Sequence, residues 1–93
     1  MVGAVKNAIL RMRRAHAEMG TSNSGYYELV KKGLATRPVK MHGEGSRAAG
    51  IPAYEVEAIL AARIAGQSDA EIRALVDRLH ARRQEQARSL AAE

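Results

Sequence analysis

Glycine and proline residues divide this chain into helical segments around a non-helical middle. Gly20, Gly33 and Gly66 each follow a run of helix-forming residues, and glycine readily adopts the left-handed conformation that ends a helix. Between residues 34 and 51, Pro38 and several glycines exclude a continuous helix. The sequence therefore predicts a small β-hairpin between Pro38 and Ile51, flanked by helices over residues 12–19, 22–32, 52–65 and 68–88.

Polar residues mark where two of these helices begin. Ser22 is a favourable N-cap, because its hydroxyl can accept a hydrogen bond from the first turn. Ser68 and Glu71 have the spacing of a capping box, in which each side chain bonds the other residue's backbone amide. Pro52 suits the first turn of the helix that it opens.

Apolar spacing sets the orientation of the second helix. Tyr26 and Leu29 share one face, so we expect both to be buried. Tyr27 and Lys31 then face solvent.

The last two helices each carry an apolar stripe, at Val56, Ile59, Leu60 and Ile64 and at Ile72, Leu75, Val76 and Leu79. Past His80 the apolar face is mostly lost, so that tail is expected to be exposed and frayed unless another chain covers it. Packing within the chain is the simplest role for the second stripe. A homodimer through residues 68–90 is the alternative.

Composition limits the possible classes. Ninety-three residues form one domain, and zero cysteines exclude disulfides, thiolate zinc sites and cysteine nucleophiles. No apolar stretch approaches a membrane span, and the first residues lack the order of a signal peptide, so we expect a cytoplasmic protein without a membrane partner. The three histidines are scattered and no nucleophile–base pattern is present. The sequence therefore predicts no enzyme activity, no metal site and no cofactor.

Positive charge is concentrated in the first half of the chain. Residues 1–50 carry nine Lys or Arg and three acids, whereas residues 51–93 carry six Arg and seven acids. Such a basic region attracts nucleic-acid phosphates. The alternative is that these cations only keep the protein in solution.

Two helices joined by a tight glycine turn are typical of a helix-turn-helix, whose second helix enters the DNA major groove. In that geometry asparagine can pair with adenine and glutamate can accept from cytosine, while cations bind phosphates. The predicted DNA-binding residues are Arg13, Arg14, Ser22, Asn23, Ser24, Tyr27, Glu28, Lys31, Arg37, Lys40 and Arg47.

The run from about Leu10 to Ile64 resembles AlpA-type prophage regulators and small phage excisionases, which have MerR-like winged-helix domains. The resemblance rests on Gly20-Thr21-Ser22, Ser24-Gly25-Tyr26-Tyr27, Lys32-Gly33, Pro38-Val39-Lys40-Met41 and Glu55-Val56-Glu57-Ala58-Ile59-Leu60. The chain departs from the family at Ala35-Thr36, where the family has Phe-Pro, and at Ile51 and Ile59, where it has Trp.

This resemblance implies a mostly α fold, a winged helix-turn-helix with a hairpin wing and an added long C-terminal helix. The expected organisation is a partly ordered N-terminus over residues 1–9, a DNA-binding domain over 10–66 and a C-terminal helix over 67–93. The implied function is sequence-specific regulation of transcription, of prophage or mobile-element type. One alternative is an excisionase that bends DNA beside an integrase, and another is an adaptor that binds proteins through the C-terminal helix.

Overall fold

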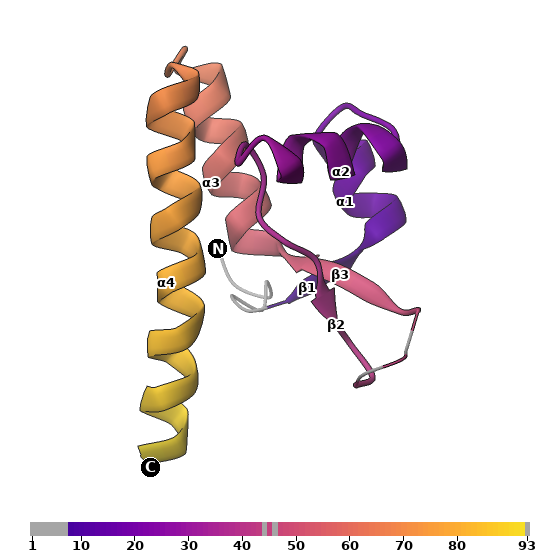
Figure 1. Cartoon of the computed structure of the whole chain (residues 1–93), viewed down its shortest axis with the longest axis vertical. Helices are drawn as coiled ribbons and strands as arrows, with labels where there is room; N and C mark the ends of the chain where they lie inside the picture. The colour runs from indigo at the N-terminus through magenta and orange to yellow at the C-terminus, as the bar shows by residue number, and fades with distance from the viewer. Residues whose placement is uncertain (1–7, 44, 46, 93) are drawn as a thin grey trace, which may run out of the picture.

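The computed structural model describes residues 8–43, 45 and 47–92. It is mostly helical, with a small three-stranded antiparallel sheet and a long C-terminal helix (Figure 1). The elements run in the order β1 (Ile9–Arg11), α1 (Met12–Glu18), α2 (Asn23–Lys31), β2 (Val39–Lys40), β3 (Ala49–Pro52), α3 (Ala53–Ile64) and α4 (Asp69–Ala92). The four predicted helices and the hairpin are therefore confirmed, with ends that differ by a few residues.

The sheet contains one strand more than the sequence predicted. β1 pairs with β3, with Ile9 opposite Pro52 and Arg11 opposite Gly50, and β3 also pairs with β2. We had assigned residues 1–9 to a partly ordered lead-in, but Ile9 lies in this strand, and residues 1–7 lie outside the described residues. Gly50 permits the pairing, because a Cβ there would stand 2.5 Å from both Ile9 Cγ2 and the Leu10 carbonyl oxygen.

The predicted helix caps are present. Ser22 Oγ accepts a hydrogen bond from the Gly25 amide at 3.1 Å. Ser68 Oγ accepts from the Glu71 amide at 3.2 Å, and Glu71 Oε1 accepts from the Ser68 amide at 2.8 Å. Both starts thus satisfy backbone N–H groups that have no partner within the helix. Pro52 ends β3 and occupies the N-cap position of α3 without a side-chain cap, so α3 begins one residue later than predicted.

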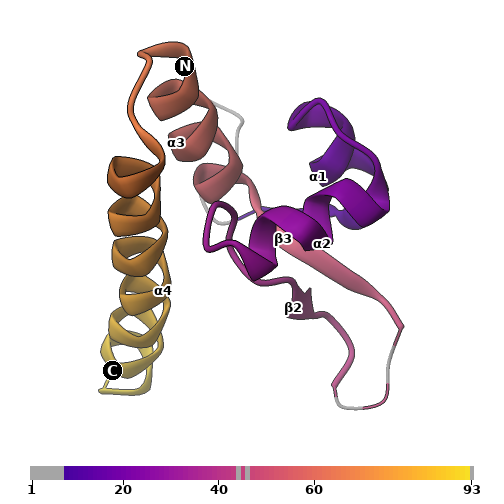
Figure 2. The same ribbon diagram turned by 45° about the horizontal axis from the view of Figure 1, so that its top comes forward.

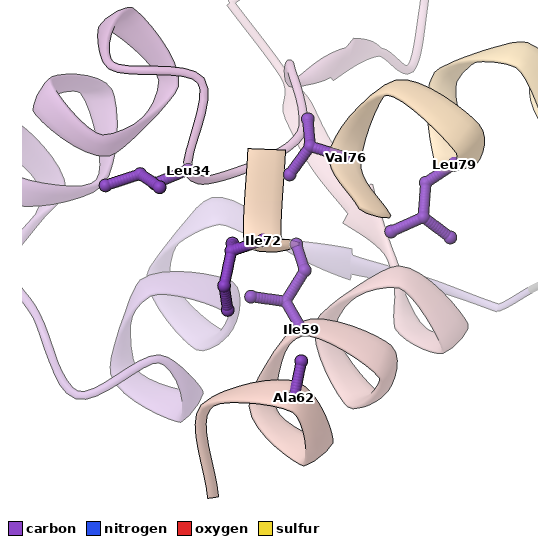
Figure 3. Close-up of a cluster of buried hydrophobic side chains, with 6 residues drawn as sticks. All are labelled: Leu34, Ile59, Ala62, Ile72, Val76 and Leu79. Carbon is purple, nitrogen blue, oxygen red and sulfur yellow. The ribbon is translucent and has the colours of Figure 1, made fainter. Parts of the chain in front are cut away.

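Two buried clusters form the interior. The first joins α3, α4 and the segment that follows α2, and consists of Leu34, Ile59, Ala62, Ile72, Val76 and Leu79 (Figure 3). The second joins α1, α2, β3 and α3, and consists of Ala15, Tyr26, Ala35, Ile51 and Val56. Partly buried Met19 and Leu29 pack against both clusters and connect them.

The stripe on α4 packs within the chain, as the simpler of the two interpretations predicted: Ile72, Val76 and Leu79 are buried against α3. The stripe on α3 was wrong at one position, because Ile64 is 85% exposed. The buried face of α3 follows Glu55, Ile59 and Ala62, with i, i+4 and i+7 spacing, and Ile64 lies off that face.

The helices lie on two sides of the molecule. α3 and α4 run side by side, while α1, α2 and β2 lie on the side of α3 away from α4 (Figures 1 and 2). The tail of α4 stays helical through Ala92 and does not fray where we expected it to. Leu90, on that tail, is 70% exposed.

A buried ion pair joins α3 to α4. The Glu55 carboxylate is fully buried, and Arg83 donates to both of its oxygens, from Nε to Oε2 at 2.8 Å and from Nη2 to Oε1 at 2.7 Å. Arg83 Nη2 also donates to the Arg37 carbonyl oxygen at 2.8 Å. One guanidinium therefore connects α4, α3 and the segment that leads into β2.

Removal of the guanidinium should destabilise the fold. Arg83→Leu leaves the Glu55 charge buried without its partner, which should lower the free energy of unfolding by about 3–5 kcal/mol. Arg88→Leu removes an exposed arginine from the same helix and should change it by no more than about 0.5 kcal/mol. Urea unfolding followed by circular dichroism measures both. Equal losses in the two variants would contradict a structural role for the pair.

Candidate nucleic-acid interface

A short turn with defined hydrogen bonds joins α1 to α2. Gly20 has a φ of +73°, a left-handed conformation that permits the reversal. The Thr21 amide donates to the His16 carbonyl at 2.9 Å. His16 Nδ1 lies 2.9 Å from the Thr21 carbonyl oxygen, and because a carbonyl can only accept, the ring nitrogen is the donor. These bonds fix the angle between the two helices.

The orientation of α2 matches the prediction at its two tyrosines. Tyr26 is fully buried and donates from its hydroxyl to the Thr36 carbonyl oxygen at 2.8 Å, whereas Tyr27 is 42% exposed. Lys31 is exposed as predicted, but Leu29 is only partly buried because it lies between the two clusters. The rings of Tyr26 and Tyr27 meet edge to face, with centroids 6.4 Å apart.

The outward face of α2 is polar. Ser22, Asn23 and Ser24 are exposed at its start. Further along, Glu28 and Lys31 form an ion pair of 3.8 Å with both side chains more than half exposed. Exposed pairs of this kind contribute little to stability, about 0–1 kcal/mol. Both side chains can therefore exchange this contact for one with a ligand at small cost.

A hollow of about 880 Å³ opens between the start of α1 and the beginning of β3. Four arginines line it, Arg11, Arg13, Arg14 and Arg47, and we name it the arginine hollow. The other lining residues are Ile9, Leu10, Met12, Ala17, Ala48 and Ala49, so none of the described lining residues is acidic. Arg14 also meets Glu18, outside the lining, at 3.5 Å, with both side chains exposed. The hollow therefore brings concentrated positive charge together with apolar side chains.

The structure thus brings together three predicted residues, Arg13, Arg14 and Arg47, and adds Arg11. Arg11 is not among the predicted DNA-binding residues, and the strand that carries it, β1, was not predicted either. No local signal in the sequence marks the outward direction of Arg11, because the strand reads Ile-Leu-Arg and its exposed first residue, Ile9, is as apolar as the partly buried Leu10.

Two other predicted cations lie apart from the hollow. Lys40 is exposed on β2, on the far side of β3 from β1. Arg37 is exposed, but both of its backbone polar groups are bonded to α4. Its amide donates to His80 Nε2 at 3.0 Å, and its carbonyl accepts from Arg83. The structure therefore groups Arg37 with α4.

Among the described residues, no three or more His, Asp or Glu side chains are placed to hold a metal ion. None of the helices in that part of the chain combines the length and apolarity needed to cross a membrane. No family model, curated protein or solved structure matches this chain.

Burial raises the pKa of Tyr26 from 10.0 to about 12, because the phenolate would lose its hydration. The fold thus favours the neutral phenol, and the stability that Tyr26 contributes is complete below pH 10.0 and is lost as pH rises toward about 12. Tyr26→Phe should remove that part of the alkaline destabilisation while costing about 0.5–1.5 kcal/mol at neutral pH through the lost hydrogen bond.

The exposed neighbour provides the matched control. Tyr27→Phe should keep the parent's loss of stability at high pH. Urea unfolding of the three proteins at neutral and alkaline pH measures these effects. If Tyr27→Phe and not Tyr26→Phe removed the alkaline loss, the orientation of α2 would be wrong.

Proposed function

We propose that this protein binds double-stranded DNA through a winged helix-turn-helix, with α2 as the recognition helix and the hairpin of β2 and β3 as the wing. The observation that carries the proposal is the arginine hollow, which gathers four cations between α1 and β3. α1, α2 and β2 lie on the same side of the molecule, away from α4 (Figure 2). A polyanion is the ligand whose charge complements such a surface.

The polar face of α2 suits the major groove, which admits a helix. Asn23, in the first turn, can donate to and accept from adenine, and Glu28 can accept from the amino group of cytosine. Tyr27 can bind a phosphate or a base edge. These three side chains are exposed, so the recognition helix needs no rearrangement to present them. We propose that they supply selectivity between DNA sequences.

The cations have a different role. Arg11, Arg13 and Arg14 come from β1 and α1, and Arg47 from the residues that precede β3. Because these elements flank one hollow, one stretch of sugar–phosphate backbone can meet all four. Contacts of this kind add affinity to any duplex and weaken as salt displaces them. We propose that Lys40 adds a further contact from the wing.

Within DNA binding, transcriptional regulation is our first proposal and DNA bending beside an integrase is the alternative. A DNA footprint distinguishes them: a regulator protects a site at a promoter, whereas a bending factor protects repeated sites beside an attachment site.

The two classes of contact should respond differently to mutation. Arg47→Ala should weaken binding to all duplexes alike and lower the salt slope by about one unit, the loss of one phosphate contact. Asn23→Ala should cost about 1–3 kcal/mol on the preferred sequence and little on a scrambled duplex. Titrations against a selected site and a scrambled duplex, at two salt concentrations, measure both effects.

Arg78→Ala is the matched control, because it removes the same charge from the exposed surface of α4. It should leave both the affinity and the salt slope close to those of the parent. Binding lost equally in Arg47→Ala and Arg78→Ala would indicate attraction by net charge alone. A parent that bound no DNA at low salt would refute the proposed function.

A further inference from the structure

α4 holds both backbone groups of a single residue at the entrance to the wing. The Arg37 amide donates to His80 Nε2 at 3.0 Å, and the Arg37 carbonyl accepts from Arg83 Nη2 at 2.8 Å. Only Pro38 separates Arg37 from β2. α4 lies on the opposite side of the molecule from α1 and α2 (Figure 1). Two of its side chains therefore fix, from that side, the point where the chain enters the wing.

The bond to His80 exists only while the imidazole is neutral. A backbone amide is a donor, so Nε2 must be the acceptor and the ring proton is on Nδ1. Addition of a proton to Nε2 turns this acceptor into a donor that faces another donor. A protonated ring thus loses the bond and opposes the Arg37 amide.

The surroundings of His80 favour the neutral ring. Partial burial disfavours the protonated, charged form of the His80 ring. The positive charges of Arg37, before β2, and of Arg83, on α4, act in the same direction. Glu55 on α3 and Asp77 on α4 act in the opposite direction, but the Glu55 carboxylate already has both oxygens bonded to Arg83. Together these groups lower the pKa of His80 below 6.5.

We propose that His80 is a positioning residue for DNA binding, whose neutral ring holds the wing in place and whose protonation releases the start of β2. The proposal rests on the proposed DNA-binding function and adds its regulation by pH. The wing carries Lys40 and Arg47. Release of the residues that lead into β2 therefore frees cations that DNA binding requires in fixed positions.

The direction of the pH effect follows from the lowered pKa. Well above pH 6.5 the ring is neutral in both folded and unfolded chains, and His80 adds no pH dependence. As pH falls below 6.5 the unfolded chain binds the proton first, so the stability of the folded state declines until the folded ring is also protonated. Local release of the wing should therefore begin in mildly acidic solution.

His80→Gln tests the proposal, because a glutamine oxygen can accept the same hydrogen bond without taking up a proton. DNA affinity of both proteins is measured at about pH 7.5 and about pH 5.5, within the range where histidine changes charge. At the higher pH the two should bind alike. At the lower pH the parent should bind about two- to tenfold more weakly than His80→Gln, the value of one hydrogen bond.

His42→Gln, on the exposed β2–β3 connection, is the control. At about pH 5.5 it should bind DNA as weakly as the parent and more weakly than His80→Gln, because the Arg37 amide is bonded to His80. Identical pH profiles for the parent and His80→Gln would overturn the proposal.

A measurement without DNA separates this proposal from the proposed function. The backbone amide signal of Arg37 is followed by NMR against pH, with circular dichroism to monitor helix content. In the parent the Arg37 amide signal should shift in acid and its protection from exchange, relative to the intrinsic rate at each pH, should fall while helix content is retained. In His80→Gln neither should change. An unresponsive Arg37 amide, or global unfolding in its place, would overturn the proposal even where DNA binds. A parent that bound no DNA would refute the proposed function, with the amide still reporting on His80.

Discussion

The rest of the structure depends on a buried carboxylate that must be neutralised. Glu55 is fully enclosed at the start of α3, and an unpaired charge there would be costly. Arg83 neutralises the Glu55 charge and donates two hydrogen bonds to the carboxylate. The same guanidinium also donates to the Arg37 carbonyl oxygen. Because the three partners come from α4, α3 and the segment before β2, the register of α4 against α3 and the path into the wing are set together. A shift of α4 by one turn would leave both acceptors without a donor.

Local patterns made much of the fold predictable. The caps at Ser22 and Ser68 and the glycine turns depend on residues a few positions apart, so the sequence displays them directly. The features it did not display depend on residues far apart in the chain. Strand β1 exists because Gly50 lets it approach β3, and the Glu55–Arg83 pair joins charges that look like ordinary surface residues on their own helices.

The candidate site was predictable to the same degree. The faces of α2 followed from helical spacing, which separated Tyr26 from Tyr27 correctly. The gathering of Arg13, Arg14 and Arg47 with Arg11 did not follow from any local pattern, because it depends on how α1 leaves the sheet beside β3. The position of Arg37 could not be predicted from a local pattern either, since the groups that bind its backbone lie more than forty residues later, on α4. Charge segregation indicated a basic surface, and only the fold defined its shape.

The pairing of β1 with β3 also has a consequence for the order in which the chain folds. The α3–α4 hairpin brings together neighbours in sequence across a short turn, and such contacts form early because little chain entropy is lost. Closure of the sheet instead requires β1 to pair with β3, with Ile9 opposite Pro52, after α1, α2 and the wing have formed. We therefore expect the three-stranded sheet to close late, after the folding transition state. Substitutions in β1 would then act mainly on the rate of unfolding, and substitutions between α3 and α4 on the rate of folding.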